Sequence, residues 1–208
     1  MTEPNYDQEF WERLWSKTLH EHPDKVANRL PNAHLIAEVG GLRPGRALDA
    51  GCGHGADTLW LAAQGWQVTA VDFSASALAH GRATAEALGR GIAERIAWIE
   101  GDLATWTAAP EHYDLVACLY VHVAGSVNEM VQRMASGVAR GGTLFMVGHC
   151  PIDPATGAAT AAAGQVQVSV EATTVALDPG IWEIVVAEER PRDVANSGVD
   201  AVIRAHRL

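Results

Sequence analysis

Apolar residues along this chain recur with two different spacings. Short apolar runs, typical of buried strands, alternate with longer stretches in which apolar residues recur every three or four positions, as in amphipathic helices. The predicted strands cover residues 46–50, 67–72, 96–100, 113–120, 143–148, 182–187 and 201–207. The predicted helices cover residues 7–20, 34–40, 56–64, 75–88, 126–140 and 168–177. This alternation favours an α/β fold with a doubly wound sheet.

The stretch RALDAGCGHGAD, residues 46–57, connects the first strand to the helix after it through a turn rich in glycine. In doubly wound sheets such a turn binds a ligand beyond the carboxyl end of the strand. Gly51, Gly53 and Ala56 also fit the dinucleotide pattern, so an NAD(P)-dependent oxidoreductase is one interpretation. Asp49, however, would repel a pyrophosphate and attract an ammonium group, and Gly55 lies one place earlier than that pattern expects. A nucleoside with a positive, amino-acid-bearing tail fits better, and S-adenosylmethionine (SAM) has that chemistry.

LDAGCGHGAD resembles the first motif of the Rossmann-type SAM-dependent methyltransferases. The resemblance extends from about Leu35 onward, and the segment LAAQGWQVTAVDFSASAL is similar to small bacterial enzymes of the tellurite-resistance and thiopurine methyltransferase kind. It implies a seven-stranded, mostly parallel sheet with an antiparallel last strand and helices on both faces. It also implies SAM as cofactor and S-adenosylhomocysteine as product.

Asp72 ends the second strand, 21 residues beyond Gly51, where a carboxylate accepts hydrogen bonds from ribose hydroxyls. The alternative is a helix cap, but Ser74 is the better cap, which leaves Asp72 for the ribose. By resemblance, Phe73 lies against the adenine, and Asp102 and Leu103 bind its edge; a simple turn at Asp102 is the alternative. The predicted cofactor residues are Asp49, Gly51, Cys52, Gly53, Asp57, Asp72, Phe73, Ser74, Asp102, Leu103, Leu119 and Trp15.

Residues 1–33 are predicted to form a helical segment before the first strand. Trp11 and Trp15 recur at helical spacing. They either cover the edge of the core, the commoner role of aromatic stripes, or close over the cofactor as a lid. In the resembling enzymes a segment at this point borders the cofactor, which makes Arg29 and Asn32 further candidates.

The methyl acceptor is expected at the carboxyl ends of the fourth and fifth strands. Base-amino methyltransferases often carry Asn or Asp, two prolines and an aromatic residue after the fourth strand, whereas this chain has LYVH, residues 119–122. His122 and His149 are candidate general bases because histidine titrates near neutral pH, and Tyr120 is a third pocket candidate. Each of the three can instead line the rim. His54 is expected in an exposed loop.

The composition indicates which binding partners and which cellular compartment to expect for the chain. The net charge of −10 lacks the basic footprint that nucleic-acid binding needs. The three cysteines, Cys52, Cys118 and Cys150, have no paired spacing, which suits a reducing cytoplasm without disulfides or a metal site, and Cys118 and Cys150 are expected as ordinary buried thiols. The polar N-terminus resembles no signal peptide, no apolar run reaches membrane-spanning length, and an arginine- and alanine-rich composition suggests a bacterial source.

The chain is therefore expected to be a single domain, residues 1–208, that transfers a methyl group from SAM to a small-molecule acceptor by direct displacement. Its length leaves little room for a substrate-capping insertion. The attacked atom (oxygen, nitrogen or sulfur) and a monomeric or homodimeric state stay open. A SAM-binding protein without catalysis is a second alternative. Residues 153–164, rich in alanine, glycine and proline, are predicted to form a mobile loop.

Overall fold

A computed structural model of the chain describes residues 8–22, 24, 26, 29–122, 125–153, 156–160, 164, 166–192 and 198–208. Parts of three predicted segments lie outside these residues. They are the start of the N-terminal segment with part of its loop, much of the predicted mobile loop 153–164, and the centre of the polar turn between the last two strands. Val123, at the predicted border of the acceptor site, also lies outside them.

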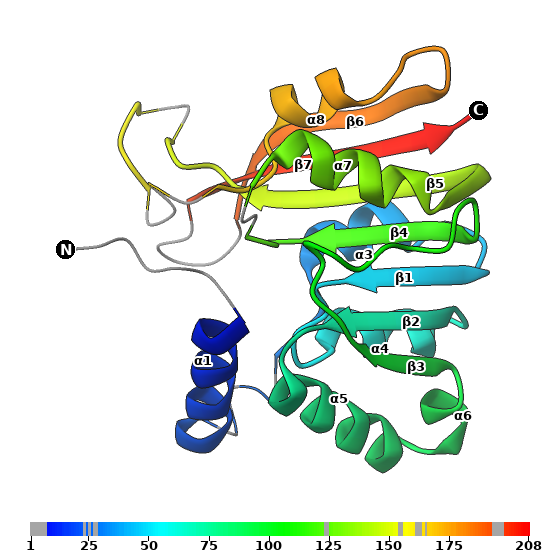
Figure 1. Ribbon diagram of the computed structural model, residues 1–208, viewed down its shortest axis with the longest axis vertical. Helices are drawn as coiled ribbons and strands as arrows, with labels where there is room; N and C mark the ends of the chain where they lie inside the picture. The colour runs from blue at the N-terminus through cyan, green and yellow to red at the C-terminus, as the bar shows by residue number, and fades with distance from the viewer. Residues whose placement is uncertain are drawn as a thin grey trace. The chain divides into compact units, whose positions relative to one another are not determined.

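Seven strands form one sheet with the order β3-β2-β1-β4-β5-β7-β6, and helices flank it (Figure 1). The strands are β1 (Arg46–Ala50), β2 (Gln67–Asp72), β3 (Ile96–Glu100), β4 (Tyr113–Leu119), β5 (Val138–His149), β6 (Trp182–Pro191) and β7 (Val199–Arg207). The described helices are α1 (Gln8–Glu21), α3 (Ala33–Val39), α4 (Ala56–Ala63), α5 (Ala75–Leu88), α6 (Arg90–Ala93), α7 (Val127–Ser136) and α8 (Val170–Ala176). The predicted α/β fold with a doubly wound, mostly parallel sheet is confirmed.

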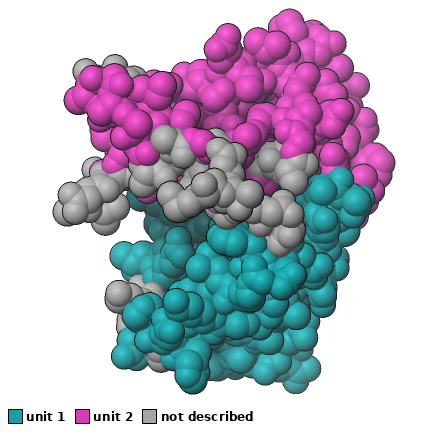
Figure 2. All heavy atoms as spheres, turned by 60° about the vertical axis from the view of Figure 1, so that its left-hand side comes forward, with its two compact units in different colours: residues 1–106 teal, residues 107–208 magenta. Residues whose placement is uncertain are grey.

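The chain divides into two compact units, Met1–Trp106 and Thr107–Leu208, which Figure 2 shows in different colours. In the first unit, β1 and β3 pair with β2 in parallel. The apolar run of β1 is buried except at Arg46, which explains why it reads as a strand without alternation. Helices α4 and α5 pack against β2 and against each other, and α1 packs against α5.

In the second unit, β4 and β5 are parallel, whereas β7 pairs antiparallel with both β5 and β6. The predicted antiparallel last strand is therefore confirmed. Helices α7 and α8 contact each other and the strands of this unit. Ser126 and Ser169 cap the two helices by accepting hydrogen bonds from backbone N–H groups three residues on, as helix N-caps do.

Three boundaries differ from the predicted ones by four residues or more, and one of them is the end of β6, at Pro191 rather than at residue 187. Helix α7 ends at Ser136 rather than at residue 140, and β5 begins at Val138 rather than at residue 143. The carbonyl groups of Ser136 and Gly137 accept hydrogen bonds from the backbone N–H groups of residues 111–113, so this tertiary contact ends the helix. The short helix α6 was also not predicted, because Gly89 ends α5 and at once begins the next turn of helix. Among the described residues, no helix has the length and apolar character needed to cross a bilayer.

Candidate active site

The glycine-rich turn after β1 is tied directly to the neighbouring strand β2. Gly51 and Gly53 have φ angles of 80° and 53°, in the left-handed region that residues with a Cβ seldom adopt. The backbone N–H of Gly51 donates to the carbonyl of Val71 at 2.8 Å, and that of Gly53 donates to Oδ2 of Asp72 at 2.8 Å. The predicted steric role of these glycines is confirmed, and their conformation joins the turn to the end of β2.

Asp72 is buried, and both of its carboxylate oxygens accept backbone hydrogen bonds. Oδ1 accepts from Ser74 N–H at 2.9 Å, and Oδ2 accepts from Gly53. Burial raises the pKa of this carboxyl group even though these bonds lower it. Ser74 caps α5 as predicted, by accepting from Ala77 N–H. The expectation that Asp72 is thereby left free is wrong, because it also anchors the turn; each oxygen still has a second lone pair for a ribose hydroxyl.

Asp49 is the most deeply buried carboxylate of the first unit, with 2% of its surface exposed. It accepts a hydrogen bond from the Thr58 hydroxyl group. Burial, followed by the negative charges of Asp57 and Asp72, raises its pKa to about 7. Burial also raises the pKa of Asp57, whose Oδ1 accepts from the backbone N–H of Asn32 at 2.7 Å. The turn is thus surrounded by carboxylates that a cation would stabilise and a pyrophosphate would not.

Gly55 has a packing role that the sequence did not reveal. A Cβ atom at Gly55 would lie 2.6 Å from the indole ring of Trp98 on β3, and one at Gly81 on α5 would lie 2.5 Å from the same ring. Both glycines therefore make room for Trp98. The early third glycine of the motif has a structural cause here besides any approach to a ligand.

His54 is buried, so the expectation of an exposed loop residue is wrong. Burial, together with the charges of Arg29 and His80, lowers its pKa to about 4, which keeps the ring neutral at physiological pH. Its Nε2 atom is buried without a hydrogen-bond partner among the described residues. The ring of Trp15 lies 5.2 Å from that of His54, and the indole also contacts Gly53. Trp15 therefore lies over the glycine turn, and its role as a lid over the cofactor stays a prediction.

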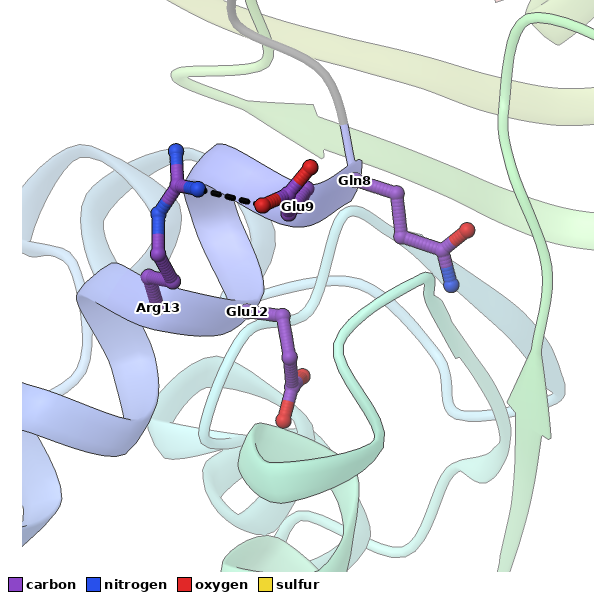
Figure 3. A pocket seen from close by; sticks show the side chains of 4 residues that line it. All are labelled: Gln8, Glu9, Glu12 and Arg13. Atoms are coloured by element: carbon purple, nitrogen blue, oxygen red, sulfur yellow. Dashed lines mark hydrogen bonds and ion pairs between the residues drawn. The ribbon is translucent and has the colours of Figure 1, made fainter.

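Helix α1 is held above the turn between β2 and α5 by polar side chains. The carboxylate of Glu12 accepts hydrogen bonds from the hydroxyl groups of Ser74, at 2.7 Å, and Ser76. Nε2 of Gln8 donates to the carbonyl of Phe73 at 3.0 Å. Figure 3 shows an open hollow lined by Gln8, Glu9, Glu12 and Arg13, in which Glu12 points toward α5 while Glu9 pairs with Arg13.

The other predicted cofactor residues of the first unit have mixed local roles. Asp102 is exposed and accepts from Ala104 N–H at 2.8 Å, which is the simple turn considered as its alternative. Leu103 is buried, and Phe73 and Cys52 are half-buried. The side chain of Asn32 caps α3 by accepting hydrogen bonds from the backbone N–H groups of His34 and Leu35. These contacts leave the assignments to adenine as predictions.

In the second unit, Tyr120 and His149 meet at a buried carboxylate. Asp200 on β7 is fully buried, and its Oδ2 accepts from the Tyr120 hydroxyl group at 2.7 Å. Its Oδ1 lies 2.9 Å from Nδ1 of His149 and 3.3 Å from Nε of Arg192. The rings of Tyr120 and His149 stack with their centroids 4.1 Å apart. Two of the three predicted catalytic residues are therefore in direct contact.

His122, the third candidate, belongs to the same cluster through Gln167. Nε2 of Gln167 lies 3.5 Å from Nε2 of His122, and Oε1 of Gln167 accepts from the backbone N–H of His149 at 2.8 Å. Burial, followed by the charge of His149, lowers the pKa of His122. Leu119, the cofactor candidate at the end of β4, is buried. Gln167 thus links the His122 ring to the backbone of His149.

Cys118 and Cys150 are buried, as predicted, and burial raises the pKa of the Cys150 thiol to about 11, so it stays protonated at neutral pH. Within the part of the chain that the structure describes, no three His, Cys, Asp or Glu side chains are grouped so that they could hold a metal ion.

Sequence reasoning missed Glu12, Gln167 and Asp200. Only Asp200 carried a signal, because an acid inside the apolar run of β7 is rarely buried unless other groups pair with it. The polar face of α1 and the stretch before α8 gave no comparable signal for Glu12 or Gln167, whose partners described above lie 18 to 64 residues away.

Comparison with known proteins supports the reading of the glycine turn. Residues 47–142 match the family model described as a methyltransferase domain. A curated relative, ribosomal RNA small subunit methyltransferase C from Alcanivorax borkumensis, is 48% identical over 62 residues, or 29% of this chain. That match covers only 18% of the relative's length.

Solved structures share the fold over most of the chain. N-methyltransferase NodS from Bradyrhizobium japonicum, crystallised with S-adenosylhomocysteine, is 17% identical with a TM-score of 0.70, over 95% of this chain and 98% of that one. TehB from Haemophilus influenzae is 17% identical with a TM-score of 0.67, over 95% of this chain and 67% of that one. Magnesium protoporphyrin IX methyltransferase from Synechocystis is 20% identical with a TM-score of 0.62, over 100% and 90%. Residues 47–142 thus match a methyltransferase domain, and SAM-dependent methyltransferases of known structure share the fold of this chain.

Proposed function

We propose that this chain binds SAM through the glycine turn of its first unit and transfers the methyl group to a small-molecule acceptor. The observation that carries the proposal is the group of carboxylates around that turn. Burial raises the pKa values of Asp49, Asp57 and Asp72, and the negative charges of Asp57 and Asp72 raise that of Asp49 further. A ligand with a positive ammonium and sulfonium group relieves this repulsion, whereas the pyrophosphate of NAD(P) increases it.

In this proposal Asp72 accepts hydrogen bonds from the ribose hydroxyls with its remaining lone pairs, and Asp49 attracts the ammonium group. Phe73, Asp102 and Leu103 bind the adenine, and Leu119 is a further cofactor residue. Gly51, Cys52, Gly53 and Ser74 supply the turn and the cap that shape the site. Trp15, which contacts Gly53 from α1, covers the turn when SAM is bound.

The domain supplies positioning for the displacement, and SAM carries the reactive methyl group. Holding a nucleophile in line with that methyl group can provide roughly 7–11 kcal/mol of the barrier. We take residues 1–208 as one catalytic domain, because the family match runs from the first compact unit into the second.

A small-molecule acceptor agrees with the acidic chain, whose net charge of −10 opposes a phosphate backbone. NodS is an N-methyltransferase, and the Synechocystis enzyme acts on magnesium protoporphyrin IX. The ribosomal RNA methyltransferase is similar over 62 residues only. We place the protein in a bacterial cytoplasm on the grounds of its composition and its unpaired cysteines.

Calorimetric titration with S-adenosylhomocysteine, run beside NAD and NADP, tests the cofactor. We expect micromolar binding of S-adenosylhomocysteine alone, with a loss of at least tenfold in Asp72→Ala and in Asp49→Asn. The matched control is Asp114→Asn, an exposed acid on β4. Affinity should also fall as pH drops below about 7, because protonation of Asp49 removes the charge that attracts the ammonium group. Binding of NAD instead would make the protein an oxidoreductase.

A further inference from the structure

The cluster of Tyr120, His149 and Asp200 lies entirely within the second unit and fixes the state of one histidine ring. An ionised carboxylate can only accept hydrogen bonds. Because Oδ1 of Asp200 lies 2.9 Å from Nδ1 of His149, Nδ1 must carry the hydrogen. In the neutral ring, Nε2 is then the basic nitrogen. The His149 side chain is 24% exposed, so this nitrogen belongs to a ring that solvent or substrate reaches.

The ring of Tyr120 stacks on that of His149, and the backbone of Tyr120 has an unusual conformation. Its φ angle is 55°, in a region that bulky residues seldom adopt outside functional sites. Three contacts keep it there: its N–H donates to Val147 at 2.8 Å, its hydroxyl group donates to Asp200, and its ring stacks on His149. This conformation orients the phenol so that its hydroxyl group donates to Asp200 while its ring stacks on His149.

We propose that His149 accepts the proton of the methyl acceptor and that Asp200 is the positioning residue that orients it. This inference rests on the proposed function and names the acceptor class: a hydroxyl or amine that must lose a proton on methylation, rather than a thiolate that needs no base. The acceptor X–H forms its new X–CH₃ bond as the sulfonium–methyl bond breaks and S-adenosylhomocysteine leaves. The proton passes to Nε2 of His149 and then to solvent.

The groups that surround His149 agree with this assignment. Asp200 and Tyr120 contact the ring, Arg192 shares Oδ1 of Asp200, and His122 lies nearby through Gln167. Burial alone would raise the pKa of Asp200, but the hydrogen bonds from His149 and Tyr120 and the charge of Arg192 outweigh it and lower that pKa. Asp200 therefore stays ionised and remains a hydrogen-bond acceptor throughout the neutral range.

Nitrogen NMR of protein labelled at its histidines tests the orientation without a known acceptor. The neutral His149 ring should show Nδ1 protonated and Nε2 bare. In Asp200→Asn the amide can offer only one oxygen, so the tautomer of His149 should shift toward Nε2–H. The control is Asp178→Asn, an exposed acid of the same unit. A wild-type ring with Nε2 protonated, or a tautomer unchanged in Asp200→Asn, overturns the positioning role.

Turnover of radiolabelled SAM with catechol and with thiophenol as probes tests the chemistry. For catechol, His149→Gln and Asp200→Asn should lower kcat by about 10²–10⁴-fold with little change in KM, and alkaline pH should restore the rate as catechol ionises. For thiophenol, which is already ionised, both variants should lose much less of kcat than for catechol, because no proton has to be removed. Methylation of thiophenol without catechol, or unchanged catechol turnover in His149→Gln, overturns the proposal.

The proposed function is tested by a different experiment. It is overturned if the wild-type protein does not bind S-adenosylhomocysteine. The tautomer measurement on His149 stands whether or not that binding is found. If the wild type methylates neither probe, the NMR result alone decides the orientation by Asp200.

Discussion

Asp49 and Asp200 are both buried carboxylates, yet their surroundings move their pKa values in opposite directions. Asp49 in the first unit has one hydroxyl donor and two nearby carboxylates, and its pKa rises to about 7. Asp200 in the second unit faces His149, Tyr120 and Arg192, and its pKa falls below the usual value. Both carboxylates are buried, so the groups around each one decide whether its pKa is raised or lowered.

The difference separates two uses of a buried charge. Asp49 lacks a positive partner among the described residues, so a cationic ligand has the most to gain there. Asp200 already has its partners and acts on them by holding a tyrosine and a histidine in place. We therefore associate the first carboxylate with binding of the cofactor and the second with activation of the acceptor.

Substitution of Asp200 should have the largest effect on the free energy of unfolding. Asp200→Leu leaves the partners of a buried carboxylate unpaired, which should lower the free energy of unfolding at pH 7 by about 3–5 kcal/mol. Because the folded pKa of Asp200 is lowered, its contribution is present above about pH 3.8 and is lost as pH falls through the folded value. Urea unfolding at pH 7 and at pH 3 measures this, with Asp178→Leu as control. An equal loss at both pH values would show a packing effect alone.

The first site should respond in the opposite direction. Asp49→Asn removes a buried charge while keeping an oxygen for Thr58, so the unliganded protein should be stabilised at pH 8 by roughly 1–3 kcal/mol. The folded pKa is raised, so the wild type loses stability as pH rises from about 4 to about 7 and the variant does not. Thermal unfolding at pH 5 and pH 8 checks this: the gain should be small at pH 5 and full at pH 8. Destabilisation at pH 8 would contradict the comparison.

Glu12 is a half-buried carboxylate that accepts several hydrogen bonds, and its substitution should have the smallest effect. Hydrogen bonds from Ser76 and Ser74 lower its pKa, so its contribution is present above about pH 4.5 and is lost at lower pH. Glu12→Gln should cost less than about 1 kcal/mol because solvent screens the site. Hydrogen exchange of the α1 amides, compared with Glu9→Gln, should show faster exchange in Glu12→Gln only. Equal exchange in both variants would mean that Glu12 does not hold α1 in place.

The sequence by itself determined most of the elements and the nature of the cofactor turn. Strands β1, β2 and β3 have their predicted bounds, because an apolar run and its flanking turn are local properties. The spacing of Asp49, Gly51 and Asp72 was also sufficient to predict a nucleoside site at the end of β1. The assignments of individual residues to SAM stay predictions, because no contact within the chain tests them.

Only the tertiary structure decided which groups meet. Asp200 is 51 residues from His149 and 80 from Tyr120 along the chain, and only the pairing of β7 with β5 brings them together. The burial of His54, the contact of Trp15 with Gly53 and the early end of α7 have the same origin. A pKa, a burial or a helix end set by a distant neighbour depends on long-range packing, which no local pattern of residues contains.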